Sequence, residues 1–316
     1  MAELSGKIVF TSGEAGDTDL WRIDLQTGEL KQLTFGKWRN WQGRWSPDGQ
    51  RIVYVSSKQG PSDLWLMDAD GGNPQRLTTD GRWYDHPDWS PDGTRIVCCS
   101  NREGTEDNEV WILTLRDARW ERRSECGAAD SYPAWSPDGK RIAFTSARSG
   151  SEDVWTLELA GGKLQRLTDA PGRDFAPAWS PDGSRVAFVA DRAVSWRDRL
   201  EVDPDLDVWL MNANGTGQRC LTTNQGTDRC VSWSPDGTQL VYSASKRGDT
   251  GERLWVLPLG GVQPTEIALD RAPLEAEIDV RPVIGVALFS FFPESIVRKF
   301  YPDSYFGTET YPHWAR

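Results

Sequence analysis

The pentapeptide Trp-Ser-Pro-Asp-Gly occurs five times and constrains the fold of this chain more than any other feature. Proline presets the backbone at the second position of a turn, aspartate bonds to nearby amides and glycine accepts a positive φ. Each copy is therefore predicted to be a tight turn between two strands. The steps between copies are 44, 46, 44 and 54 residues, and the copies begin at Trp45, Trp89, Trp135, Trp179 and Trp233.

Two further motifs recur with the same period. An acid, then Leu or Val, then Trp begins at Asp19, Asp63, Glu109, Asp153 and Asp207, with a variant at Arg253. A second tripeptide, which ends in Leu-Thr, follows it. This tripeptide begins at Gln32, Arg76, Arg166 and Cys220, and the other repeats have degraded forms. Four short strands in a period near 45 residues are typical of one propeller blade. We therefore predict an all-β propeller of four-stranded blades, with the repeated Trp side chains packed between neighbouring blades.

The ends of the repeat predict how the ring closes. Residues 1–269 account for the blades, and residues 6–11 match the second strand of a blade, so the first blade needs an innermost strand from elsewhere. Tyr311-Pro-His-Trp314 matches Tyr132-Pro-Ala-Trp135, and we expect residues 309–316 to be that closing strand. The aromatic-rich residues 270–308 are either an insertion in a six-bladed ring or a degenerate seventh blade. Six blades are favoured because residues 291–308 are few for two more strands.

Composition excludes several classes of protein. The chain has 316 residues with 36 basic and 47 acidic side chains, a formal net charge of −11, which argues against a nucleic-acid binder. The longest apolar run, residues 284–292, is too short to cross a bilayer. The first ten residues lack the pattern of a secretory signal. The five cysteines, Cys98, Cys99, Cys126, Cys220 and Cys230, show no zinc-ligand spacing and are expected to be reduced thiols.

The sequence offers little material for catalysis. His86 and His313 are the only histidines, so a histidine metal cage or a Ser-His-Asp triad is not expected. The Ser and Asp of the five turns repeat in every copy, which indicates architecture. There is no phosphate-binding glycine loop and no dinucleotide motif. We therefore predict no catalytic residues and no cofactor, except for a Ca²⁺ ion that an acidic position of the repeat could hold.

One position in the repeat holds several acids. The residues five positions before the inner-strand Trp include Asp130, Asp174, Asp228 and Glu309, whereas Asn40 and Tyr84 stand there in two other blades. Inner strands of a propeller begin at one mouth of its central channel, so these carboxylates would form a partial acidic ring. Such a ring suits Ca²⁺, which prefers oxygen ligands, or a basic side chain of a partner. The alternative is that these acids only cap the preceding loops.

The loops that lead into the inner strands open on the same mouth. The long loop of residues 191–205 joins a second to a third strand and should project there too. Trp, Tyr and Arg are the residue types that anchor protein interfaces. We predict a partner-binding surface from Trp38, Arg39, Trp41, Arg82, Trp83, Tyr84, Arg173, Phe175, Trp196 and Arg229.

The succession of the three motifs resembles the repeat of TolB-type propellers, which is also found in the propeller domains of prolyl-oligopeptidase-like peptidases and of the tricorn protease. The resemblance covers residues 6–269 and resumes at Tyr311. It implies the propeller fold and, for TolB, a periplasmic location, whereas the missing signal and the odd cysteine count favour the cytoplasm. The Gly-x-Ser-x-Gly nucleophile turn of the peptidases does not occur in this chain, so peptidase activity of its own is not expected.

These features favour a non-enzymatic scaffold that docks a protein or peptide at the loop-rich mouth, with the aromatic segment of residues 270–308 as a second contact surface. Two alternatives stay open. One is a metal-dependent small-molecule hydrolase or lactonase-like propeller, for which the acidic ring would hold the metal. The other is an accessory propeller that works beside a separately encoded peptidase.

Overall fold

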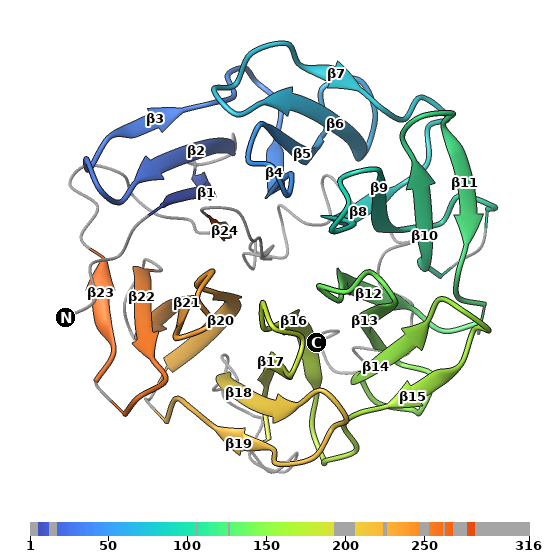
Figure 1. The fold of residues 1–316 in the computed structure, drawn as a ribbon. Helices are drawn as coiled ribbons and strands as arrows, with labels where there is room; N and C mark the ends of the chain where they lie inside the picture. The colour runs from blue at the N-terminus through green and yellow to red at the C-terminus, as the bar shows by residue number, and fades with distance from the viewer. Residues whose placement is uncertain are drawn as a thin grey trace, which may run out of the picture.

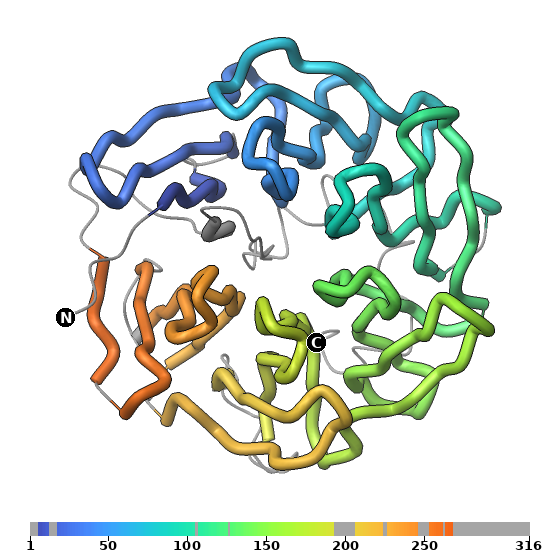
Figure 2. The backbone as a smooth tube through the Cα atoms, viewed as in Figure 1, coloured from blue at the N-terminus to red at the C-terminus, as the bar shows by residue number. Residues whose placement is uncertain are grey.

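The computed structural model describes residues 6–12, 18–104, 107–125, 127–192, 206–223, 226–246, 253–261, 263–267 and 277–281. These residues form six antiparallel sheets of four strands each, arranged around a central axis as the blades of a propeller (Figure 1). The backbone passes from blade to blade around the ring in sequence order (Figure 2). The predicted all-β fold is confirmed, and the described residues form six blades rather than seven.

The four strands of each blade lie side by side, in order from the centre of the ring outward. Blade 1 comprises β24 (Glu277–Arg281), β1 (Lys7–Ser12), β2 (Asp19–Asp24) and β3 (Leu30–Gln32). Blade 2 comprises β4 (Asn40–Trp45), β5 (Arg51–Ser56), β6 (Asp63–Asp68) and β7 (Gln75–Arg76). Blade 3 comprises β8 (Tyr84–Trp89), β9 (Arg95–Ser100), β10 (Glu109–Thr114) and β11 (Arg119–Arg122).

The second half of the ring follows the same plan. Blade 4 comprises β12 (Asp130–Trp135), β13 (Arg141–Ser146), β14 (Asp153–Glu158) and β15 (Leu164–Arg166). Blade 5 comprises β16 (Asp174–Trp179), β17 (Arg185–Ala190), β18 (Asp207–Asn212) and β19 (Arg219–Cys220). Blade 6 comprises β20 (Gly226–Trp233), β21 (Gln239–Lys246), β22 (Arg253–Pro258) and β23 (Thr265–Ile267).

Each Trp-Ser-Pro-Asp-Gly segment forms the predicted turn after an inner strand. In blade 2, Ser46 Oγ donates to Asp48 Oδ1 at 2.5 Å, and the same carboxylate oxygen accepts the Gln50 amide at 3.0 Å. The hydrogen bond from Ser46 contributes most to lowering the pKa of Asp48. Gly49 has a φ of 69°, which glycine adopts without strain. The equivalent Ser-to-Asp hydrogen bond is present in the other four copies.

The Trp side chains of the five Trp-Ser-Pro-Asp-Gly segments lie between blades, as predicted, and each is at most 5% exposed. Four of them also carry an arginine from the preceding blade over the ring. The arginine always stands six residues after its own blade's Trp, so the stacking follows the sequence repeat. The pairs are Arg51 over Trp89 at 5.1 Å, Arg95 over Trp135 at 4.7 Å, Arg141 over Trp179 at 4.5 Å and Arg185 over Trp233 at 4.7 Å.

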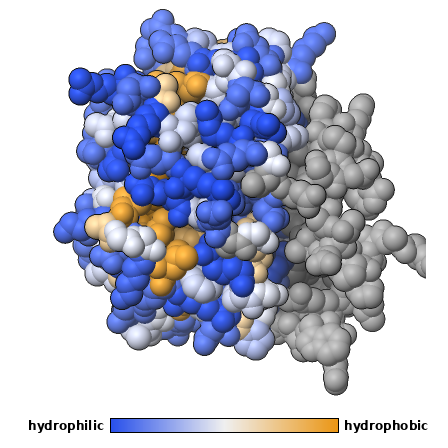
Figure 3. Space-filling model, turned by 90° about the vertical axis from the view of Figure 1, so that its right-hand side faces the viewer, coloured by the Kyte–Doolittle hydropathy of each residue, from blue (hydrophilic) through white to orange (hydrophobic). Residues whose placement is uncertain are grey.

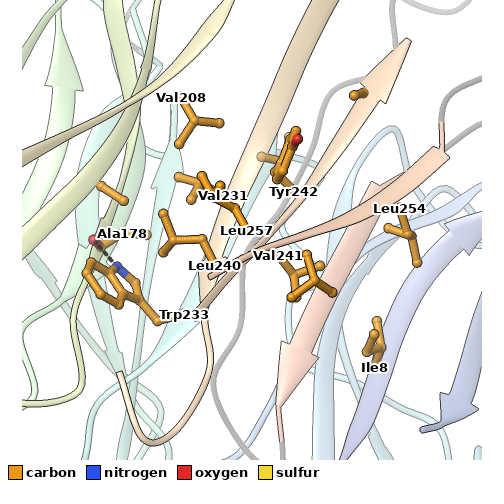
Figure 4. Packing of buried hydrophobic residues seen from close by; sticks show 14 of the residues in the cluster. Ile8, Ala178, Val208, Val231, Trp233, Leu240, Val241, Tyr242, Leu254 and Leu257 are labelled. Carbon is orange, nitrogen blue, oxygen red and sulfur yellow. Dashed lines mark hydrogen bonds between the residues drawn. The ribbon is translucent and has the colours of Figure 1, made fainter. Parts of the chain in front are cut away.

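One hydrophobic cluster joins blades 5, 6 and 1 (Figure 4). Trp233 is fully buried in it, and its indole Nε1 donates to the carbonyl oxygen of Ala178 in blade 5 at 3.0 Å. Ile8 of blade 1 and Leu240 of blade 6 belong to the same cluster and are fully buried. Blade faces therefore pack against each other through β-branched and aromatic side chains, as the sequence of these strands predicts.

The strand that closes blade 1 differs from the one predicted. β24 pairs antiparallel with β1, from Lys7 opposite Arg281 to Thr11 opposite Glu277. An edge of a strand can pair with one neighbour only, so β24 takes the place expected for residues 309–316. The ring is thus closed by a strand that follows the last blade, and that strand is Glu277–Arg281, from the segment expected to be an insertion or a degenerate seventh blade. Residues 282–316 lie outside the described residues.

The cysteines of the described residues are free thiols. Cys98, Cys99 and Cys230 are buried and Cys220 is half-buried. Burial raises the pKa of Cys98 and of Cys99, which makes both thiols poor nucleophiles at neutral pH. Cys126 lies outside the described residues.

Candidate functional site

Two sets of loops meet on one face of the ring, which we call the mouth. One set leads into the inner strands, and the other joins the second to the third strand of each blade. Backbone hydrogen bonds tie the two sets together across the blade boundaries. The residue five positions before the Trp of each inner strand donates its amide to a carbonyl of the preceding blade. These hydrogen bonds run from Asn40 to Thr18, Tyr84 to Ser62, Asp130 to Asn108, Asp174 to Glu152 and Asp228 to Leu206, at 2.8 to 3.1 Å.

Two carboxylates of the predicted acidic ring, Asp130 and Asp174, are engaged with arginines of their own blades. Arg148 Nη2 donates to both oxygens of Asp130 at 3.1 and 3.0 Å. Arg192 donates to both oxygens of Asp174 at 2.7 and 2.6 Å. Asp130, Asp174 and Asp228 are fully buried, so they lie beneath the surface of the mouth. Glu309 lies outside the described residues.

Our sequence reasoning missed a basic residue that recurs at the mouth in blades 2 to 5. Each blade from 2 to 5 has a Lys or Arg two residues after its second strand, and its charged group lies over a Trp ring of the same blade. The signal was present in the sequence, because a basic residue follows the acidic-ring position at a constant spacing of 18 residues. The pairs are Lys58 with Trp65 at 5.4 Å, Arg102 with Trp120 at 4.5 Å, Arg148 with Trp155 at 5.3 Å and Arg192 with Trp209 at 4.6 Å.

A second set of ion pairs, in which a half-buried arginine contacts a buried carboxylate, explains the other two sequence motifs. Asp63 accepts a hydrogen bond from Arg76 at 2.8 Å and another from Thr78 Oγ1 at 3.0 Å. Arg166 donates to Asp153 in the same way at 2.8 Å. The repeated acid and the Arg-Leu-Thr segment therefore fasten the third strand of a blade to the end of its fourth strand and to the residues that follow it.

Carboxylates that are already ion-paired have little capacity left for a metal ion. Among the described residues, no group of three or more His, Cys, Asp or Glu side chains is placed to hold one. Ca²⁺ in the channel stays a prediction, because Glu309 is not described. The described part of the chain also contains no helix that could span a membrane.

The predicted partner-binding residues divide by exposure. Arg82 is exposed, and Trp38, Trp83, Arg173 and Phe175 are half-buried. The other four described residues, Arg39, Trp41, Tyr84 and Arg229, are at most 8% exposed. Tyr84 illustrates why, because its hydroxyl donates to Asp80 at 2.7 Å and its ring packs against Trp120. Trp196 lies outside the described residues.

Phe35 is a mouth residue that our sequence reasoning missed. It lies in the loop between β3 and β4, and it is 67% exposed, more than any other large hydrophobic residue described. A sequence signal existed, since Phe35 follows a Leu-Thr pair at a position where blades 2 to 5 have polar residues: Thr79, Glu125, Asp169 and Thr223. An exposed aromatic among polar equivalents is a candidate contact residue.

Every inner strand from β4 to β20 has a bulge at one repeated position. The residue three before the Trp has a φ of 51° to 54° although it is never glycine; these residues are Gln42, His86, Tyr132, Ala176 and Cys230. The His86 amide donates to Gln42 Oε1 at 2.7 Å, and the His86 ring lies 4.0 Å from the Tyr132 ring. The bulges thus bring side chains of neighbouring blades into contact near the channel.

His86 is 3% exposed, and burial, with a further contribution from the Arg44 charge, lowers its pKa to about 3. An unfolded histidine titrates near 6.5, so between about pH 6.5 and 3 the unfolded chain binds the extra proton. Stability should therefore fall with falling pH in this window, by up to about 1.4 kcal/mol per pH unit from this residue.

The test is the pH dependence of the free energy of unfolding in wild type and in His86→Gln. Glutamine is chosen because Gln42 occupies the same bulge position with a φ of 54°. We expect the variant to have a shallower slope between pH 6 and 4. Parallel slopes in the two proteins would contradict the buried, neutral state of His86.

The outer wall of the ring offers less for a partner. Figure 3 shows the side that carries β11 and β15, on which hydrophilic residues predominate and apolar residues form small patches. The one large hydrophobic side chain that is exposed on an outer strand is Leu164 of β15, at 40%, within the described residues. Apolar residues exposed singly are normal on a protein surface.

The comparisons with known proteins agree on one family. The model of the TolB beta propeller domain matches residues 5–108 and 103–196. The crystal structure of TolB from Acinetobacter baumannii is similar with a TM-score of 0.73 and 22% identity, over 87% of this chain and 65% of that one. A putative TolB from Agrobacterium tumefaciens gives 0.67 and 18%, over 83% of this chain and 89% of that one.

A curated relative, a TolB homolog of Chlorobium luteolum, is 32% identical over 71 residues. The match covers 21% of this chain and 16% of the relative. The chain therefore spans only part of the curated relative and about two thirds of the Acinetobacter protein.

Proposed function

Because this chain belongs to the family of TolB beta propeller domains, in keeping with a protein-binding scaffold, we propose that its mouth docks a partner protein or peptide without catalysing a reaction. The observation that carries the proposal is the set of aromatic and arginine side chains that mouth loops present to solvent. Phe35, Trp38, Arg82, Trp83 and Phe175 are all at least partly exposed there. Side chains of these types dominate the binding energy of protein interfaces.

The mouth loops are held in place before any partner arrives. Arg39 and Ser57 exchange two hydrogen bonds between neighbouring loops, at 2.9 and 3.0 Å. Arg102 donates both to Asp80 at 2.8 Å and to the Tyr84 hydroxyl at 2.7 Å. A surface that is ordered in the free protein loses less conformational entropy on binding, which favours affinity.

The proposal is tested by affinity capture from the native source with crosslinking and mass spectrometry. Wild type is compared with Trp38→Ala/Trp83→Ala/Phe175→Ala, and Leu164→Ala serves as the control on the outer wall. We expect a defined partner that crosslinks to mouth loops and is depleted at least tenfold in the triple variant, since interface anchors each contribute about 2 kcal/mol or more. Equal recovery by the triple variant and wild type would contradict the proposal.

A further inference from the structure

The charges of the mouth are unevenly distributed. Residues 33–39 and 57–62, two loops that meet at the mouth end of blade 2, hold three basic side chains and no acidic one. Mouth loops of blades 3 to 5 contain at least one acid each, such as Asp80, Glu103, Glu125, Glu152 and Asp169. This positive part of the mouth stands out in a chain whose net charge is −11. We call Phe35, Lys37, Trp38 and Lys58 the basic sector.

The two lysines of the basic sector are available to a partner. Lys37 and Lys58 are exposed, and neither forms an ion pair with another residue that the structure describes. By contrast, Arg148 and Arg192 of later blades are only 11% exposed and are bound to Asp130 and Asp174. Ammonium groups that form no such ion pair on one part of a mouth attract acidic side chains of a partner.

The apolar part of the basic sector is adjacent and rigid. Lys58 Nζ lies 5.1 Å from the Trp38 ring and 5.4 Å from the Trp65 ring, so the cation holds one face of Trp38. Gly36 lies against the same indole, and a Cβ at this position would overlap the ring. Phe35 lies three residues before Trp38 in the same loop, and 67% of its surface is exposed.

We propose that the basic sector binds an acidic peptide segment that carries an aromatic or large aliphatic side chain. The apolar side chain packs on Phe35 and Trp38, and the neighbouring carboxylates pair with Lys37 and Lys58. This inference rests on the proposed function, because it names the partner chemistry at one part of the mouth. The opposite chemistry, a basic segment, would meet like charges at this position.

The test uses a phage-displayed library of random peptides, which presupposes no ligand. We expect the peptides enriched on wild type to be net acidic with at least one large apolar residue. Their affinity, measured by fluorescence anisotropy, should fall at least tenfold in Lys37→Glu/Lys58→Glu and weaken at higher salt. The control Lys140→Glu/Lys163→Glu makes the same charge change on exposed lysines away from the mouth, and should change affinity less than twofold.

A second matched pair tests the Trp38 stack without changing charge. Gly36→Ala displaces the indole, whereas an alanine at Gly81, in the next mouth loop, meets no atom within 4 Å. Both glycines have positive φ, at 139° and 70°, so both variants carry backbone strain. We expect Gly36→Ala to weaken the enriched peptides at least threefold and Gly81→Ala to leave their affinity unchanged.

The outcomes separate this inference from the proposed function. Peptides that bind Lys37→Glu/Lys58→Glu normally but are lost in Arg82→Ala/Trp83→Ala would overturn the basic sector and leave the mouth as the docking surface. Peptides insensitive to both double variants would contradict the mouth as well. Enrichment of neutral or basic sequences, or no enrichment over an unrelated protein, would overturn the acidic-peptide inference.

Discussion

Replacement of Asp174 by alanine is expected to lower the free energy of unfolding by about 3 to 5 kcal/mol, because it leaves Arg192 buried without its carboxylate. Asp174 and Arg192 are 1% and 11% exposed and share two hydrogen bonds. Burial raises the pKa of Asp174 even though Arg192 lowers it, so the carboxylate depends on this arginine to stay charged. Denaturant unfolding of wild type and variant measures the difference.

Two further variants give this prediction its controls. Asp182→Ala removes an exposed turn aspartate that accepts hydrogen bonds from Ser180 and Ser184, and should lower stability by only about 1 kcal/mol. Asp174→Leu/Arg192→Met removes both charges and should be less destabilised than Asp174→Ala, since no buried charge is left alone. A double variant as unstable as Asp174→Ala would contradict the reading that the unpaired arginine is the cause.

The second large effect concerns the closing strand. A chain that ends at Ile267 lacks β24, so the inner edge of β1 is left unpaired. Loss of the pairing along Lys7 to Thr11 should lower the free energy of unfolding by about 4 to 5 kcal/mol, at roughly 1 kcal/mol for each net hydrogen bond, and expose an edge prone to aggregation. Thermal unfolding and size-exclusion chromatography measure both consequences.

A chain that ends at Arg281 is the matched comparison, because it keeps β24 and removes residues 282–316. We expect it to unfold within about 1 kcal/mol of wild type, since the β1 edge stays paired. If it were as unstable as the chain that ends at Ile267, the closing role would return to residues 309–316.

The two candidates for the closing strand show what sequence patterns can and cannot reveal. Tyr311-Pro-His-Trp314 matches the inner-strand motif, whereas Glu-Ile-Asp-Val-Arg at β24 has neither the Trp nor the turn residues. A strand edge is satisfied by backbone groups, which any extended segment can supply. Motif matching therefore predicted the number of blades, which depends on repeated side chains, but did not find the strand that pairs with β1.

The loops of the mouth could be predicted from the sequence, but the contacts of their side chains could not. The repeat alone located the loops that lead into Asn40, Tyr84 and Asp174, and it suggested an acidic ring. It did not show that Arg192 reaches Asp174, because that contact depends on the register that pairs Asp174 with Ala190. The burial of Trp41 was also hidden, since the bulge between Trp41 and Arg44 interrupts the alternation of faces along the strand.

The measurement that tests the docking role most directly is hydrogen–deuterium exchange of the protein alone and in complex with its captured partner. We expect slower exchange in the mouth loops, residues 33–39, 77–83 and 167–173, when the partner is bound. The Ser-Pro-Asp-Gly turns at residues 46–49 and 90–93, at the other end of the inner strands, should exchange at the same rate in both states. Protection confined to those turns or to the outer strands β11 and β15, with unchanged mouth loops, would contradict the mouth as the docking surface.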